Sequence, residues 1–382
     1  MAVSPALAED LAAAVAMLYA DAEIALIEIL RDALVQGIDS PRWAELKLRS
    51  IGDLREAVET VTTALQDDAN GAVAEALATA YGRGRQAAVA ELGALDIGRE
   101  LHARRILPGA PAVDRLAASY AADTRPLYQR ITRAILDLFR SITSRAAGTQ
   151  LLTGITRRQA SQRALDEFAR RGVAGFVDSA GRSWELAAYA EMAVRSVTAR
   201  AAIDGHIDAM AEVGQGLVIV SNAPLECPLC RPWEGEVLAL SGPPGPRTVR
   251  TEHTVQPTGL RAAFRPPATV AVHVAGSLPE ARAAGLFHPN CRHSLSLYLP
   301  GVTTRPPDHP TPGTTYEDTQ RQRAIERHIR RWKRAEAAAM DDAARTKARA
   351  KVREWQAAAR AHVAAHEHVV RQPAREQIGR AR

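Results

Sequence analysis

The stretch at residues 11–29, LAAAVAMLYADAEIALIEI, indicates the fold class, because its apolar residues return every three or four positions. These positions are Leu11, Val15, Leu18, Ala22, Ala25 and Ile29. Such spacing is typical of one face of an α-helix and not of a strand. A second run with the same period occupies residues 51–65, and Gly37 can end the first helix while Ser40-Pro41 starts the next. The opening region therefore predicts a helical hairpin.

Composition extends the helical prediction to most of the chain. Of its 382 residues 46% are hydrophobic but only 4% are aromatic, and alanine is abundant, a bias that favours helices over sheets. Helical periodicity continues to residue 213, with a capping box, Thr156-x-x-Gln159, at one helix start. Gly82-x-Gly84 interrupts one helical stretch; close helix packing explains it better than a nucleotide fingerprint, since no strand precedes it.

The pattern changes near residue 214. Short β-type runs occupy residues 217–221, 236–240, 268–274 and 294–299, with a short helix at 277–284 and a Pro/Arg-rich loop at 243–256. We therefore expect a mainly α protein with a small α+β module. Its expected parts are a helical region at 1–155, a helical segment leading into the module at 156–213, the Cys/His-containing module at 214–301, a Pro-rich linker at 302–314 and a basic helical tail at 315–382.

Bulk features limit the class of protein. Three cysteines are too few for a disulfide framework in a chain of this length, and a reducing compartment fits them better. The first 19 residues lack a basic segment, and their uncharged run is shorter than the roughly 20 residues of a membrane span. We expect a chain that is soluble when made, is not exported by a standard signal and has no membrane partner.

All three cysteines belong to one constellation. Cys227 and Cys230 form a Cys-x-x-Cys pair, and His288 and Cys291 follow about sixty residues later, with His293 as an alternative ligand. Two such turns offer four ligands to a tetrahedral structural zinc. Two other interpretations remain open at this point: reduced thiols that only pack, and a redox or catalytic cysteine.

Enzyme signatures are scarce. A zinc deaminase would need an upstream His-x-Glu, and none occurs. The His-Glu-x-x-His, Gly-x-Ser-x-Gly and phosphate-loop signatures are missing too. We therefore predict no catalytic residues.

The positive charge is concentrated at the end of the chain. Residues 315–382 contain 17 Lys or Arg against 9 Asp or Glu, whereas the rest of the chain has a net charge of −2. Clustered cations on a helix are the usual footprint of phosphate contact. The alternative is a solvated face with its own acidic partners. The candidate contact residues for nucleic acid or a protein partner are Arg323, Arg327, Arg330, Arg331, Lys333 and Arg334.

An ordered set of motifs resembles the phage minor capsid protein family, related to the minor head proteins of Mu-like phages. The set consists of Leu217-Val-Ile-Val-Ser221, then Cys227-x-x-Cys230-x-x-Trp233-x-Gly235, then Leu286-Phe-His288-Pro-Asn-Cys291-Arg-His293, and a tail Gln320-Arg-Gln-Arg-x-Ile-Glu-Arg-x-Ile-Arg-x-x-Lys333. The resemblance covers residues 156–378 well and the first 150 residues only by their helical character.

The resemblance implies a low-copy component of the phage head, close to the portal vertex, that is made in the host bacterial cytoplasm and acts in head assembly or DNA packaging. It implies portal, major capsid or scaffold proteins as partners, packaged DNA as a contact of the basic tail, and no established enzymatic activity. Two other classes remain as alternatives: a zinc-stapled nucleic-acid-binding protein, and a zinc-dependent nucleic-acid-modifying enzyme such as a deaminase or nuclease.

Overall fold

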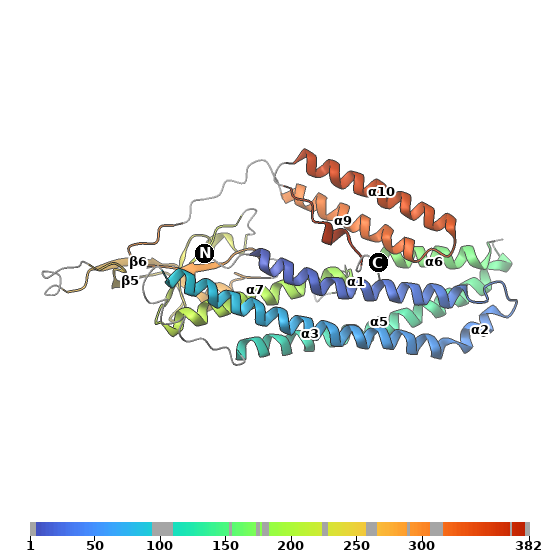
Figure 1. The fold of residues 1–382 in the computed structure, drawn as a ribbon, viewed down its shortest axis with the longest axis horizontal. Coiled ribbons are helices and arrows are strands. Elements are labelled where there is room, and N and C mark those ends of the chain that lie inside the picture. The colour runs from blue at the N-terminus through green and yellow to red at the C-terminus, as the bar shows by residue number, and fades with distance from the viewer. Residues whose placement is uncertain are drawn as a thin grey trace. The chain divides into compact units, whose positions relative to one another are not determined.

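The computed structural model describes residues 5–93, 110–152, 155–172, 176–177, 183–223, 228–256, 266–288, 291–305, 316–366 and 369–378. Its helices are α1 (Pro5–Val35), α2 (Trp43–Arg49), α3 (Ile51–Leu92), α5 (Pro111–Leu152), α6 (Arg157–Arg171), α7 (Leu186–Glu212), α8 (Leu278–Ala283), α9 (Tyr316–Ala337) and α10 (Asp342–Ala365) (Figure 1). Its strands are β1 (Phe176–Val177), β2 (Ser183–Trp184), β3 (Leu217–Val220), β4 (Val237–Ala239), β5 (Arg247–Glu252), β6 (Thr269–Val274), β7 (Gly276–Ser277) and β8 (Leu295–Leu297). The expected class, mainly α with a small α+β part, is confirmed.

The chain forms two compact units, each built from distant segments. Unit 1 comprises Met1–Leu11, Ala74–Ala117 and Met192–Thr311, and unit 2 comprises Ala12–Val73, Ala118–Glu191 and Pro312–Arg382. The five-part division expected from the sequence stays a prediction. No helix in the described part of the chain is both long enough and apolar enough to span a membrane.

Unit 2 contains a helical bundle and the C-terminal helical hairpin. Buried tyrosines join α1 to α5: the hydroxyl of Tyr19 lies 3.0 Å from that of Tyr120 and 2.7 Å from that of Tyr128. Phenols keep a polar end inside an apolar bundle only when that end is hydrogen-bonded. The triad therefore stabilises one register of α1 against α5.

The turn after α1 differs from its prediction. Gly37 does adopt a positive φ of 63°, as a helix stop requires, but Ser40 does not cap the next helix. The short α2 begins at Trp43 with Arg42 at its cap position and without a side-chain cap, and Ser40 belongs to the preceding turn. The indole of Trp43 is fully buried and donates to the carbonyl of Leu34 at 3.1 Å, so burial of this ring determines where α2 starts.

Unit 1 contains a four-stranded sheet in the order β7-β4-β3-β8, with β3 antiparallel to both neighbours and β4 parallel to β7. Alternate residues of a strand face opposite sides. Val218 and Val220 accordingly pack with Ala88 and Met210 of α3 and α7, while Val237 packs on the other face.

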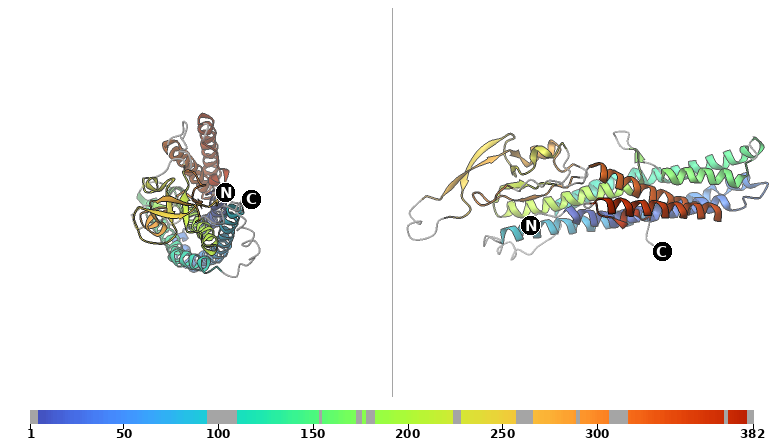
Figure 2. Two further views of the ribbon diagram at one scale, coloured as in Figure 1. Left: turned by 90° about the vertical axis from the view of Figure 1, so that its left-hand side faces the viewer. Right: turned by 90° about the horizontal axis from the view of Figure 1, so that it is seen from above.

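The segment expected to be a Pro/Arg-rich loop contains a strand. Residues of β5 pair with β6 in a six-residue antiparallel register, from Arg247 opposite Val274 to Glu252 opposite Thr269. The ribbon of β5 and β6 projects at one end of unit 1 (Figures 1 and 2). Its inward residues Val272 and Val274 pack on Val237. Valines at alternate positions of β6 favour a strand. The prolines on either side of β5 made that segment look like a loop in the sequence.

Gly84 of α3 serves close helix packing, as expected. A Cβ on Gly84 would overlap the carbonyl of Ala202 in α7, and a Cβ on Gly205 would overlap the carbonyl of Tyr81. The two backbones therefore approach more closely than any larger residue permits. At the same helix crossing Arg85 forms an ion pair with Glu212, with 2.7 Å between Nη1 and Oε1.

A candidate metal centre

The candidate site is formed by two turns of unit 1 that lie 61 residues apart in the chain. The first turn ends at Cys230, immediately before a 3-10 turn at Arg231–Trp233. The amide of Trp233 donates to the carbonyl of Cys230 at 2.9 Å, and Pro232 restricts the backbone there. Cys230 is only 1% exposed, so its thiol is fixed inside the unit.

The second turn leads from α8 into β8 and carries Cys291 and His293. The amide of Cys291 donates to the carbonyl of His288 at 2.9 Å. Ser294 then ties this segment to the end of β3: its amide donates to Ser221 Oγ at 2.9 Å, and its carbonyl accepts from the amide of Ser221 at 3.0 Å. The sheet therefore holds this turn beside Cys230.

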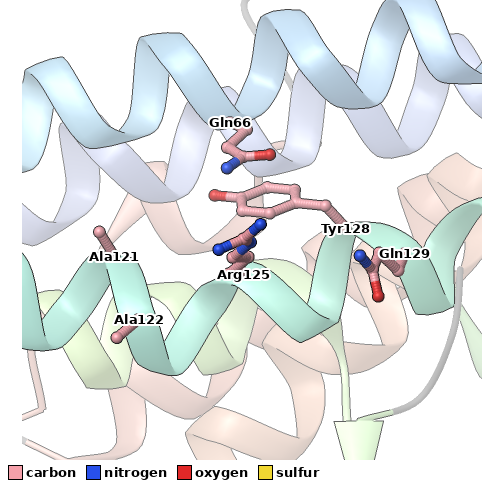
Figure 3. A pocket seen from close by; sticks show the side chains of 6 residues that line it. All are labelled: Gln66, Ala121, Ala122, Arg125, Tyr128 and Gln129. Atoms are coloured by element: carbon pink, nitrogen blue, oxygen red, sulfur yellow. The ribbon is translucent and has the colours of Figure 1, made fainter.

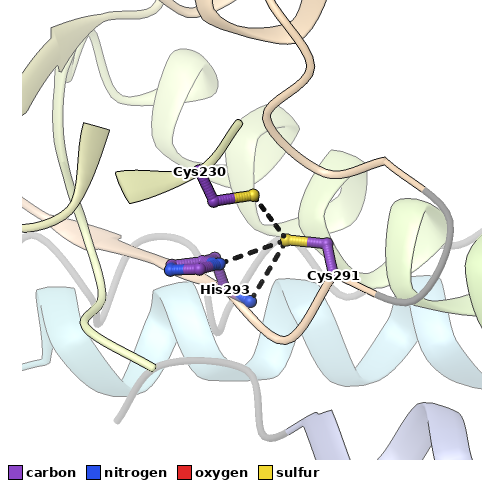
Figure 4. Close-up of side chains that lie close together, drawn as sticks. All are labelled: Cys230, Cys291 and His293. Carbon is purple, nitrogen blue, oxygen red and sulfur yellow. Dashed lines mark hydrogen bonds between the residues drawn. The ribbon is translucent and has the colours of Figure 1, made fainter. Parts of the chain in front are cut away.

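Three possible ligand atoms converge at these turns (Figure 4). The Sγ atoms of Cys230 and Cys291 are 3.6 Å apart, Cys291 Sγ is 3.2 Å from His293 Nδ1, and the three ligand atoms all lie within 4.8 Å of one another. Thiolates bound at about 2.3 Å to one tetrahedral zinc would be about 3.8 Å apart. The described donors therefore fit a small thiophilic cation.

Glu234 orients the imidazole. Its Oε1 lies 2.5 Å from His293 Nε2 and also accepts the amide of Ala223 at 3.0 Å. A carboxylate bonded to one ring nitrogen directs the other nitrogen toward a metal, an arrangement common around zinc-binding histidines. With Nε2 directed at Glu234, Nδ1 faces Cys291 and would be the ring nitrogen that binds a metal.

The local electrostatics favour a thiolate. Burial raises the pKa of the Cys291 thiol, but its hydrogen bonds to the ring and the backbone N–H of His293 outweigh burial and leave that pKa below its usual value. Burial likewise lowers the pKa of His293, but its contacts with Cys291 and Glu234 raise it above the ordinary value. A thiolate beside an oriented imidazole is a suitable metal-binding pair.

The structure brings together part of the predicted ligand set. Cys230 and Cys291 meet as expected, and the imidazole that joins them is His293, the alternative ligand, whereas His288 is not in the group. Cys227 lies outside the described residues, so its role stays a prediction. Glu234 was not predicted, because a carboxylate four residues after a cysteine belongs to no ligand motif, and only the fold brings it to His293.

Two further positions of the motif have structural roles. Trp233 packs against the apolar core of unit 1. Gly235 has φ 67° and donates its amide to the carbonyl of Val220 at 3.1 Å, and a Cβ there would lie 2.7 Å from Nε of Arg305. Any other residue would be strained at this position.

The candidate cations of the tail divide into two groups. Arg334 is 1% exposed, and its guanidinium lies 3.5 Å from Glu23 and 3.0 Å from Glu185. Arg330 contacts Glu185 at 3.2 Å and donates to the carbonyl of Arg375 at 2.6 Å. These two side chains are held by groups inside unit 2 and are not presented to an external phosphate.

The other four cations lie nearer the surface of unit 2. Lys333 donates to Gln377 at 2.8 Å, and the guanidinium of Arg331 lies 5.7 Å from the ring centre of Trp332. Arg323 and Arg331 are half-buried and Arg327 is exposed. Contact of these residues with nucleic acid or a protein stays a prediction.

A hollow of about 480 Å³ lies between α3 and α5 in unit 2 (Figure 3). Its lining consists of Gln66, Ala121, Ala122, Arg125, Tyr128 and Gln129. These side chains include one cation and no thiol, imidazole or carboxylate, so the hollow offers no acid and base pair for catalysis.

Comparison with known proteins identifies the class. A "structural protein" of Lactococcus phage LL-H is 24% identical over 179 residues, which is 46% of this chain and 43% of the relative. The chain thus matches less than half of that protein's length. This relative is thus a structural protein of a phage, similar to the chain over less than half of either sequence.

A longer match shows the family of the chain. The model of the family described as phage minor capsid protein 2 matches residues 3–364, nearly the whole chain. The chain belongs to this family, in agreement with the resemblance of its motifs. No solved structure matches it.

Proposed function

We propose that the chain is a low-copy minor protein of the phage head that acts at or near the portal vertex, in head assembly or DNA packaging. The observation that carries this proposal is the family match over residues 3–364. Its role is structural and not enzymatic. The partners that fit such a role are portal protein and the major capsid or scaffold protein.

Mass spectrometry of purified particles tests the proposal. We expect the chain to co-purify with portal and major capsid protein at a copy number far below that of the capsid protein. A small rigid tag on the chain should then add density at a single vertex in cryo-electron microscopy. Recovery of the chain only outside particles, or tag density at every vertex, would refute the assignment.

We further propose that Cys230, Cys291 and His293 hold a structural Zn²⁺. Two thiolates and an imidazole match the ligand chemistry of zinc, and Glu234 supplies the orienting carboxylate. When bound, the ion would cross-link the turn before the 3-10 helix to the turn before β8. The sequence predicts Cys227 as the fourth ligand.

Metal analysis of variants tests the ligand set. We expect about one zinc per chain, lost in Cys230→Ser, Cys291→Ser and Cys227→Ser, and a lower melting temperature of each variant. His288→Ala is the matched control and should keep the zinc, because the structure leaves His288 outside the group. Zinc-free wild-type protein, or loss of zinc only in His288→Ala, would contradict this ligand set.

A further inference from the structure

Helix α10 has one apolar face that packs on α9. Val352, Trp355 and Ala359 pack with Ile325 and Ile329 of α9. The ring of Trp355, the one aromatic residue of α10, also stacks on His328 of α9, with ring centres 4.0 Å apart and planes 4° apart. The large apolar residues in the middle of α10 are therefore already used inside the hairpin.

A row of arginines follows one flank of α10. Arg345, Arg349, Arg353 and Arg360 are separated by four, four and seven residues, which puts them on the same side of a helix of 3.6 residues per turn. The last three are exposed. The side facing away from α9 carries exposed alanines between this row and Lys347, among them Ala350, Ala357 and Ala361.

The charge of this surface is only partly neutralised by the described residues of unit 2. Helix α10 contains six Lys or Arg and two Asp or Glu. Arg345 and Arg349 contact Asp342 at 3.1 Å and Glu336 at 2.6 Å. Arg353 and Arg360, in contrast, have no ion-pair partner among the residues that the structure describes.

We propose that this arginine row, Arg345, Arg349, Arg353 and Arg360, lies along the phosphate backbone of duplex DNA and binds it without sequence preference. The inference rests on the proposed role in the head, where the packaged duplex is the polyanion. The row spans about 22 Å at about 1.5 Å per residue, the length of about six base pairs. Alanines beside it allow the helix backbone to approach the duplex closely.

The composition of the exposed face favours DNA over an acidic protein. Stable protein interfaces depend on buried aromatic or large apolar anchors. The outward side of α10 offers alanine and cations, its exposed carboxylates Asp342 and Glu354 are paired with Arg345 and Lys351, and its tryptophan is turned toward α9. Contact with phosphates requires cations alone.

The test uses the full chain and a fluorescent 20-base-pair duplex, with anisotropy measured over a series of salt concentrations. The variant Arg353→Gln/Arg360→Gln removes two charges that have no ion-pair partner within the described ranges, and glutamine keeps nearly the same helix propensity. We expect its affinity at low salt to fall about tenfold or more. The slope of log K against log salt should decrease in magnitude by about two.

The control variant, Arg55→Gln/Arg133→Gln, makes the same change in net charge at exposed positions of α3 and α5. Unchanged binding by this variant supports a specific surface. Equal losses in both variants, or no binding of DNA by the wild type, would overturn the proposal. Incorporation of the chain into particles is measured separately, so the proposed head function can hold even if the DNA contact fails.

Discussion

Replacement of Arg334 by methionine should unfold the junction between the C-terminal hairpin and the bundle of unit 2. The guanidinium lies between the carboxylates of Glu23 and Glu185, and its Nε donates to the carbonyl of Ala169 at 3.0 Å. Arg334 and Glu23 are each 1% exposed, so the substitution leaves two carboxylates around the place of one buried cation. Removing one member of a buried ion pair costs about 3–5 kcal/mol, and we expect a loss in this range.

Urea unfolding followed by circular dichroism measures the loss, and hydrogen exchange should show weaker protection in α9. The matched control is Arg345→Met in α10, whose guanidinium contacts Asp342 at 3.1 Å on the surface. Loss of this surface ion pair should lower the free energy of unfolding by only about 0–1 kcal/mol.

A second variant keeps the test independent of general disruption. Adding Glu23→Gln to Arg334→Met removes one of the two carboxylate charges that face the guanidinium in the wild type, and we expect the double variant to recover part of the lost stability. The reasoning would be refuted if Arg334→Met cost no more than the surface control, or if the double variant lost the sum of both single effects.

Three further predictions concern stability. Gly84→Ala should destabilise unit 1 by more than about 2 kcal/mol, because the added Cβ would overlap the backbone of α7. Gly71→Ala in the same helix places its Cβ in open space and should stabilise the protein by up to about 1 kcal/mol. Similar melting temperatures of the two variants would disprove the close crossing. Ser277→Ala removes a complete capping box from α8 and should cost about 1 kcal/mol in urea unfolding; no change would show that α8 does not depend on its cap. Burial raises the pKa of Glu185, but the charges of Arg334 and Arg330 outweigh burial and hold that pKa below the usual range. The ionised Glu185 therefore stabilises the folded state fully above the unfolded pKa of about 4.3, and this contribution is lost as the pH falls further. The stability difference between wild type and Glu185→Gln should therefore shrink as pH falls from about 5 to about 3, and a constant difference would contradict this assignment.

Local signals predicted much of the secondary structure. The box at Thr156 and Gln159 forms with both of its hydrogen bonds, and the apolar run at residues 217–221 becomes β3. These features depend on neighbours a few residues apart, and periodicity and capping report on such neighbours. The strand β5 was missed because its pairing with β6 is a longer-range property. Burial of Trp43 likewise depends on α1, which the sequence of α2 does not show.

The candidate site was predictable in its elements but not in its geometry. Cysteine and histidine are distinctive enough to single out Cys230, Cys291 and His293 in the sequence. The choice of His293 over His288 depends on the contacts of Ser294 with Ser221, which position the turn on β3. Nothing in the sequence singles out Glu234, and only the fold brings its carboxylate to 2.5 Å from the imidazole of His293.

The tail shows most clearly why net charge does not identify a binding surface. Two arginines of α9, Arg330 and Arg334, contact carboxylates of unit 2 and thereby secure the helix to its neighbours. In α10 two others, Arg353 and Arg360, are exposed and make no such contact with any residue that the structure describes. Both pairs contribute equally to the charge of the sequence, yet loss of the first should lower stability and loss of the second should lower affinity for a polyanion. Stability and binding measured on the same variants can therefore separate the structural cations of this tail from those available to a ligand.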